Sequence, residues 1–364
     1  MPNNPAMKIS HMYTYPIKSL CGVEVNSIPV TKHGFPYDRR FMLLKVVRDD
    51  NGTVTFKNMA VAHFYEMALF TQAIALPVDE EDSGSVTVTF YPPPGKGVKT
   101  SLDIPLRPEL TDELETIRIE MHRSATQAYR MPAVYSDWFS TCFGYEVILA
   151  YLGSHLRKVL MTSRNNNNNA AKSSTKPPSS WLASLTSSAA ALISSVGDDE
   201  DYITFADCAP YLIVSETSLH AIDARLTQDA KMDMRKFRPN IVIAGASEPW
   251  AEDFWGQLTF TSSSMSPPQL TILNCEQNCG RCQSINVDYQ TGETATGDEG
   301  QVLKILAKDR RVDKGMKWNP IFGRYSFLHA GGGEGNVLSV GDEVVVSRMN
   351  TERTRFDWEG LCTK

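Results

Sequence analysis

The chain has 364 residues, of which 42% are hydrophobic and 21% charged, and it carries a formal net charge of −6. This composition is that of a globular protein with enough apolar residues for one large or two modest cores. The acidic balance argues against a nucleic-acid binder, which usually carries a basic excess. No run approaches the roughly 20 apolar residues of a membrane helix, and the first residues lack the pattern of a targeting peptide. Seven cysteines fit a reducing compartment.

Residues 1 to 155 are predicted to be mostly strand. Alternating apolar and polar residues, as in GSVTVTF and TIRIEMH, are typical of half-buried strands. Asn51-Gly52 lies between two such runs and predicts a tight hairpin. Near the end of this region, Val134, Trp138 and Phe139 lie at helical spacing, and Gly144 marks the end of the predicted helix.

The composition changes abruptly between residues 164 and 200. This stretch contains five consecutive asparagines, many serines and two prolines. Such a sequence has too few apolar residues to build a core. We therefore predict a low-complexity, disordered insertion over residues 156–201.

Strand patterns return at Tyr202 and continue to about residue 350, followed by a tail over residues 351–364. Ser215 is the expected N-cap of a short helix, and a second, amphipathic helix is expected to bury Val302, Ile305 and Leu306. The glycine cluster at residues 331–335 is not a dinucleotide-binding fingerprint, because no helix follows it. The sequence as a whole predicts a β-rich α+β protein with two bodies.

Three cysteines fall within eight residues, in the run CEQNCGRC that contains Cys275, Cys279 and Cys282. A zinc site would need a fourth ligand, and the spacing also occurs in iron–sulfur sites. A thioredoxin-type dithiol would open a helix, whereas a strand and a turn are expected here. A single reactive thiolate at Cys282, beside Arg281, is a further reading, and ordinary unreactive thiols are the simplest one.

Six runs, one of which contains Cys279 and Cys282, carry a further signal: YPIKSLCGVEV, YDRRFMLL, FRPNIVIAGASEPWAEDFW, CGRCQSINVDYQTG, NPIFGRYSFL and LSVGDEVVV. The later runs resemble the MOSC domain, the type found at the C-terminus of molybdenum-cofactor sulfurases, and the first two resemble the β-barrel domain that precedes it. The whole pattern is similar to that of the mitochondrial amidoxime-reducing components. The resemblance implies an N-terminal MOSC β-barrel-like domain over residues 1–155 and a MOSC β-barrel domain with flanking helices over residues 202–350.

The resemblance also implies roles for individual residues. Cys282 would be the protein ligand to molybdenum and, with Asp207, a catalytic residue. Where the family commonly has Asp-Thr-Ser, this chain has Asp207-Cys208-Ala209, so two hydroxyl groups are replaced. The residues expected to bind the molybdenum cofactor are Lys18, Ser19, Arg39, Cys208, Ala209, Arg238, Asn240, Gly280 and Arg281.

From the same resemblance we expect a molybdenum-cofactor-dependent reductase of N-hydroxylated compounds such as amidoximes and hydroxylamines. Its electrons would come from a b-type cytochrome fed by a flavin reductase, since no flavin or nicotinamide fingerprint is present in the sequence. The alternative is a non-enzymatic carrier of the cofactor, or of sulfur on Cys282. A cytoplasmic location is expected, with mitochondrial association left open.

Overall fold

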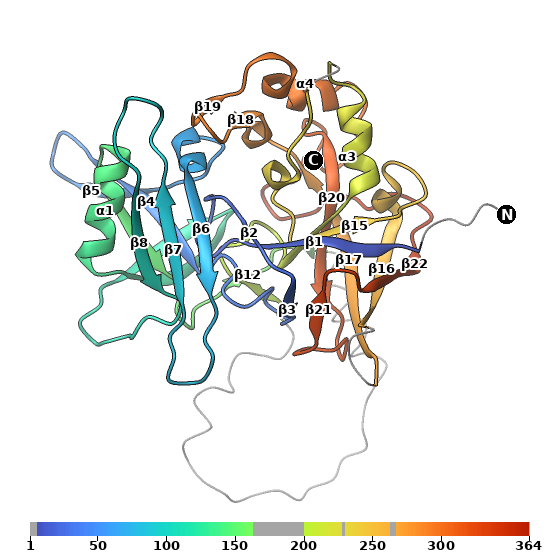
Figure 1. Cartoon of the computed structure of the whole chain (residues 1–364), viewed down its shortest axis with the longest axis horizontal. Coiled ribbons are helices and arrows are strands. Elements are labelled where there is room, and N and C mark those ends of the chain that lie inside the picture. The colour runs from blue at the N-terminus through green and yellow to red at the C-terminus, as the bar shows by residue number, and fades with distance from the viewer. Residues whose placement is uncertain (1–5, 163–199, 228–229, 263–266, 364) are drawn as a thin grey trace, which may run out of the picture.

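The structure is a computed structural model that describes residues 6–162, 200–227, 230–262 and 267–363. Figure 1 shows two β-rich halves side by side, the first coloured blue to green and the second yellow to red. Most of the predicted disordered insertion, residues 163–199, lies outside the described residues. No helix in the described ranges is both long and apolar enough to cross a membrane.

The second half is a closed seven-stranded barrel with the strand order β15-β14-β20-β17-β16-β22-β1. The first and last strands of that order pair with each other, which closes the barrel and leaves no free edge. The two-residue strand β2 adds to β1. The strands are β1 (Lys8–Thr14), β2 (Val23–Glu24), β14 (Tyr211–Ser215), β15 (Ile241–Ala244), β16 (Trp255–Ser262), β17 (Gln269–Gly280), β20 (Ile321–Leu328) and β22 (Glu343–Met349).

The first strand of the chain therefore belongs to the second half. Strand β1 pairs antiparallel with β15 and contacts β22, and Figure 1 shows it crossing into the yellow and red half. The chain then enters the first half at a parallel bridge between Ile17 and Phe41. This crossing places the segment that follows β1 at the junction between the two halves.

The first half contains a nearly closed five-stranded sheet with the order β5-β4-β11-β10-β9. The Asn58 side chain spans the opening and donates a 2.8 Å hydrogen bond to the Glu120 carbonyl. A three-stranded sheet, β6-β7-β8, lies beside it. These strands are β4 (Phe41–Arg48), β5 (Val54–Asn58), β6 (Phe70–Ala75), β7 (Ser85–Phe90), β8 (Thr100–Pro105), β9 (Thr116–Met121), β10 (Ser124–Arg130) and β11 (Val147–Tyr151).

Short elements connect and cover the sheets. Three two-stranded pairings join β3 (Ser27–Pro29) to β21 (Val337–Ser339), β12 (Arg157–Lys158) to β13 (Tyr202–Ile203), and β18 (Val287–Asp288) to β19 (Glu293–Thr294). The helices are α1 (Ala133–Phe143), α3 (Glu216–Asp223), α4 (Val302–Leu306) and the 3₁₀ turns η1 (Tyr65–Leu69), η2 (Met234–Phe237), η3 (Ala251–Phe254), η4 (Gln283–Asn286) and η5 (Gly297–Gln301).

The predicted β-rich fold with two barrel-like bodies is confirmed. Asn51-Gly52 joins β4 to β5, and Gly144 ends α1 in the left-handed conformation with φ 76°. The helix predicted around Val134, Trp138 and Phe139 is α1, in which Val134 is 62% exposed. Ser215 is the N-cap residue of α3 as expected, although its side chain makes no capping hydrogen bond there.

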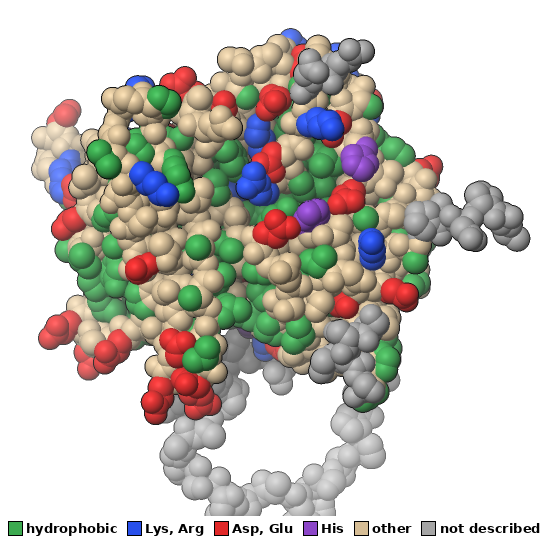
Figure 2. Space-filling model, in the orientation of Figure 1, with side chains coloured by type: hydrophobic (Ala, Val, Ile, Leu, Met, Phe, Trp, Pro, Cys, Tyr) green, Lys and Arg blue, Asp and Glu red, His purple; other side chains and the backbone are tan. Residues whose placement is uncertain are grey.

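On the face shown in Figure 2, basic side chains are scattered rather than gathered into one patch. Acidic side chains gather at the lower edge of the first half. Both features agree with the acidic net charge of the chain.

The Glu252 carboxyl group is wholly buried in the second half, as is that of its neighbour Asp253. Glu252, in η3, accepts a 2.7 Å hydrogen bond from the Ser218 hydroxyl of α3, and its other oxygen makes no hydrogen bond among the described residues. Burial raises the pKa of Glu252 to about 7, and the neighbouring Asp253 carboxylate adds to the rise. Because the folded state favours the protonated form, the stability that this proton contributes is complete below pH 4.5 and is lost as pH rises through 7.

We therefore expect the free energy of unfolding of the wild-type protein to fall by about 2–3 kcal/mol between pH 5 and pH 8 relative to Glu252→Gln, which mimics the protonated acid. Urea unfolding at several pH values measures this difference. The exposed Glu248→Gln variant is the matched control and should follow the wild type. Parallel curves for wild type and Glu252→Gln would show that Glu252 does not titrate in this range.

Candidate functional site

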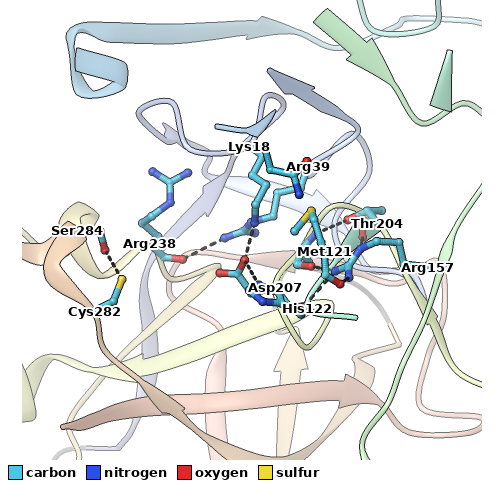
Figure 3. Close-up of polar contacts among 12 residues, drawn as sticks. Lys18, Arg39, Met121, His122, Arg157, Thr204, Asp207, Arg238, Cys282 and Ser284 are labelled. Atoms are coloured by element: carbon cyan, nitrogen blue, oxygen red, sulfur yellow. Dashed lines mark hydrogen bonds and ion pairs between the residues drawn. The ribbon is translucent and has the colours of Figure 1, made fainter. Parts of the chain in front are cut away.

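Cys282 lies two residues beyond the end of β17 and occupies the N-cap position of η4. Its side chain is exposed, and its Sγ lies 3.3 Å from the Ser284 hydroxyl (Figure 3). Cys275 and Cys279 are both buried. Since no group of metal-ligating side chains gathers within the described residues, a cage built from these three cysteines finds no support there.

Cys282 lies at a cavity formed by both halves of the molecule. The cavity has a volume of about 130 Å³ and adjoins a wider cleft of about 850 Å³, to which Cys282 and Asp207 also contribute. Every residue expected to bind the cofactor lines the cavity except Cys208, which lines the wider cleft. The cavity residues among them are Lys18, Ser19, Arg39, Ala209, Arg238, Asn240, Gly280 and Arg281.

The cavity is strongly cationic. In the described part of the chain, Asp207 supplies its only carboxylate, whereas five basic side chains line it: Lys18, Arg39, Lys236, Arg238 and Arg281. Basic side chains collected in a concave site favour an anionic ligand, and guanidinium groups suit a phosphate in particular.

The ring of Tyr15 holds two of these guanidinium groups. Arg39 and Arg238 each lie 4.5 Å from the centre of the ring, within the range of cation–π attraction. Tyr15 is buried, and its hydroxyl donates a 3.0 Å hydrogen bond to the Pro239 carbonyl of the second half. Burial raises the pKa of Tyr15, so the hydroxyl remains a donor at neutral pH.

Arg238 keeps an unused donor. Its Nη1 donates a 2.9 Å hydrogen bond to the Leu20 carbonyl, but its buried Nη2 makes no hydrogen bond in the described structure. The neighbouring polar group is the Tyr289 hydroxyl; burial raises the pKa of Tyr289 to about 12, and Arg238 opposes that rise. A buried donor without a partner is rare, and a bound anion would satisfy it.

The backbone is unusual at three of the expected cofactor residues. Ser19, Arg39 and Arg238 have φ values of 72°, 52° and 56°, in the left-handed region that residues with a side chain seldom adopt. Each such residue carries roughly 1 kcal/mol or more of strain, and strain of this kind gathers at functional sites. The surrounding fold therefore fixes these three residues in directions that an unstrained backbone does not favour.

Lys18, Asp207 and His122 form a network at the edge of the cavity (Figure 3). The Asp207 carboxylate lies 2.5 Å from the Lys18 ammonium and 3.2 Å from Nε2 of His122. Burial in the cleft acts to raise the pKa of Asp207, but the opposing effects of Lys18 and His122 hold it well below its usual value. Burial lowers the pKa of Lys18, and Asp207 offsets part of that change.

Arg157 fixes the segments that carry this network. It is wholly buried, and its guanidinium donates to the carbonyls of Thr204, Ala206 and Asp207 and to that of Met121, which precedes His122. Arg157 lies at the start of the stretch interpreted from the sequence as a disordered insertion. The structure shows that residues 157–158 instead pair with residues 202–203 as part of the folded body.

Arg281 and Asn240 use their polar atoms mainly on the protein itself. The Arg281 guanidinium donates to the carbonyls of Phe237 and Phe322 and lies 5.5 Å from each of their rings. The Asn240 side chain accepts from the Leu212 amide at 3.1 Å and from Arg39 at 3.3 Å. Both residues line the cavity, and both also hold its walls in place.

The remaining expected residues contribute shape. A Cβ atom on Gly280 would lie 2.3 Å from Met316 Sδ and 3.1 Å from Asn319 Cβ, so a larger residue there would require the Met316 side chain to move. Ala209 and Cys208 are buried in the core of the second half. Burial raises the pKa of the Cys208 thiol, which therefore stays protonated in place of the hydroxyl common in the family.

Sequence reasoning missed several residues of the site. Lys236 and Tyr325 line the cavity, and Tyr15 and His122 organise it, yet none was singled out. Lys236 and Tyr15 lie within the quoted FRPN and YPIKS regions or next to them, so proximity to those runs could have indicated them. His122 lies in a turn between β9 and β10 and carries no sequence signal.

The fold and the cavity together define a class: two-barrel proteins with a cationic cavity between the barrels and an exposed thiol at its edge. Residues 200–345 match the MOSC domain, and residues 6–146 match the MOSC N-terminal beta barrel domain. The chain is therefore a MOSC-domain protein that also carries the N-terminal β-barrel domain of that family.

The individual proteins to which the chain is similar include amidoxime-reducing components and a molybdenum cofactor sulfurase. The chain is 32% identical over 146 residues to mitochondrial amidoxime-reducing component 1 of Homo sapiens, a match covering 40% of the chain and 39% of the relative. It is 24% identical over 344 residues to the protein of the same name from Mus musculus, covering 92% and 81%. It is 26% identical over 349 residues to molybdenum cofactor sulfurase of Oryza sativa subsp. japonica, covering 92% and 35%. The chain spans about two fifths of the length of the first curated relatives that it matches.

We expect Arg281→Lys to lower the free energy of unfolding by about 2–4 kcal/mol, because lysine keeps the charge but cannot donate to both buried carbonyls. Urea unfolding of the purified protein measures the loss. Arg311→Lys, at an exposed position, is the matched control and should change stability by less than about 0.5 kcal/mol. Wild-type stability in Arg281→Lys would mean that the hydrogen bonds from the guanidinium to the two carbonyls do not contribute to stability.

Proposed function

We propose that this protein is a molybdenum-cofactor-dependent reductase of N-hydroxylated compounds such as amidoximes and hydroxylamines. The observation that carries the proposal is the exposed thiol of Cys282 beside a cavity lined by basic residues from both halves. The names of the relatives support the reaction class, and the cavity supports the kind of cofactor.

The side chains fit such a cofactor. Molybdopterin carries a phosphate on a pterin rich in hydrogen-bonding groups, and the cavity has Lys18, Arg39 and Lys236 together with the unused donor of Arg238. Cys282 presents a soft sulfur ligand suited to molybdenum. When bound, the cofactor would supply two-electron oxygen-atom chemistry, which no side chain of the protein provides.

The protein's own residues would place the substrate and manage protons. Reduction of an N-hydroxyl group consumes two electrons and two protons and releases an amine or amidine and water. Asp207 and His122 lie in the same cleft as Cys282, and His122 is partly exposed to solvent, from which protons can be replaced. The electrons would come from an external carrier, which we propose to be a b-type cytochrome served by a flavin reductase.

A carrier function is the second candidate, and the long match to a molybdenum cofactor sulfurase favours it. In that case Cys282 would hold the cofactor, or sulfur as a persulfide, for delivery to other proteins. Metal analysis separates the two candidates. Stoichiometric molybdenum with donor-dependent reduction of benzamidoxime supports the reductase, whereas a persulfide on Cys282 without molybdenum supports the carrier.

We expect the Cys282→Ala variant to retain no molybdenum, because it lacks the proposed metal ligand. Its rate of benzamidoxime reduction should fall at least 100-fold, which corresponds to a loss of about 2.7 kcal/mol or more of transition-state stabilisation. Cys275→Ala, at a buried thiol in the strand β17 that precedes Cys282, is the matched control and should keep both. Molybdenum content by mass spectrometry and reduction rates with a chemical electron donor are the measurements. Equal losses in the two variants would point instead to a general effect on the fold.

A further inference from the structure

The wider cleft beside Cys282 has a definite chemical character. Its volume of about 850 Å³ is large enough for a drug-sized molecule. Its lining includes the small residues Ala60, Ala62 and Gly280. It also includes the apolar side chains Met316, Leu361 and Trp318, and the Trp318 side chain is 72% exposed. An indole this exposed in a concave site offers a flat surface for an aromatic ring.

The same cleft holds positive charge that no carboxylate of the described residues balances. Lys304, in α4, and Arg311, a few residues beyond it, both line the cleft and are both exposed. Neither makes a hydrogen bond or an ion pair with the part of the chain that the structure describes. Asp207 is the one carboxylate among the described lining residues, and it already pairs with Lys18 and His122.

From these features we infer that the cleft takes an N-hydroxylated aromatic compound carrying an acidic group, such as a carboxylate. The inference rests on the proposed function and names its substrate class. The aromatic ring lies against Trp318, the N-hydroxyl group faces Cys282, and the acidic group lies by Lys304 and Arg311. Reduction then breaks the N–O bond, and two electrons from a reduced carrier and two protons give the N–H bond and water.

A preference for acidic over neutral substrates would distinguish this cleft from one that binds aromatic compounds through apolar contacts alone. A neutral aromatic amidoxime uses Trp318 but not the two cations. An acidic one gains two charge-assisted contacts at a partly screened site, which together should raise kcat/KM by a factor of about 5–20. The preference should also weaken as salt is added, since exposed charges are screened.

The experiment compares benzamidoxime with 4-carboxybenzamidoxime, using reduced methyl viologen as electron donor so that no protein partner is involved. We expect the wild-type protein to prefer the carboxylated compound by about 5–20-fold in kcat/KM. The variant Lys304→Glu/Arg311→Glu should remove or invert that ratio. The matched control is Lys308→Glu, an exposed lysine near α4 outside the cleft lining, which should keep the wild-type ratio. A ratio unaffected by the double substitution overturns the inference.

Binding gives a readout that does not depend on turnover. Binding of the product 4-amidinobenzoate should quench tryptophan fluorescence in the wild-type protein. The Kd obtained from this quenching should be at least fivefold higher in the double variant. Trp318→Phe should lose most of the quenching. If neither amidoxime is reduced, the proposed function fails, and the charge dependence of this binding still decides the nature of the cleft. Binding that is the same in wild type and double variant overturns the inference.

Discussion

The site depends on one contact, the packing of the Arg39 and Arg238 guanidinium groups against the ring of Tyr15. Two neighbouring cations repel each other, and the attraction of both to the same electron-rich ring makes their approach tolerable. Arg39 follows the crossing into the first half and Arg238 precedes β15 of the second, so the same contact joins the halves and collects charge in the cavity. The Tyr15 hydroxyl reinforces the junction through Pro239.

The position of β1 explains how one short segment can serve both halves. Because β1 closes the second barrel, the residues that follow it, Tyr15 to Ser19, must leave that barrel and enter the first half. The amide of Lys18 then bonds to the Phe41 carbonyl, and the amide of Arg39 bonds to the Tyr15 carbonyl. Lys18, Ser19 and Arg39 are thus brought to one place by backbone pairing, and the left-handed conformations of Ser19 and Arg39 aim their side chains.

Much of this arrangement could be predicted from the sequence, because strands and hairpins depend on patterns of residues that lie close together in the chain. The Asn51-Gly52 turn, the helix ending at Gly144 and the alternating runs of the second half all follow from rules that act over a few residues. The site residues came from resemblance, and the cavity gathers nearly all of them. Arg157 and His122 were not predictable in this way: Arg157 adjoins a low-complexity stretch, and its partners at Met121 and Ala206 are distant in sequence.

The basic side chains around the cavity fall into groups according to the atoms that they contact. Arg157 donates to backbone carbonyls, and so does Arg281, so their main effect is on the shape of the walls. Lys18, Arg39 and Lys236 each face a carboxylate, and in each pair part of the charge is already balanced. Among the described residues, the groups left for a ligand include the free donor of Arg238 and the thiol of Cys282, with Lys304 and Arg311 in the wider cleft. A phosphate in the cavity, a soft metal at the thiol and an acidic substrate in the cleft would together satisfy these groups, so the cofactor and the substrate proposed for this protein use different charges.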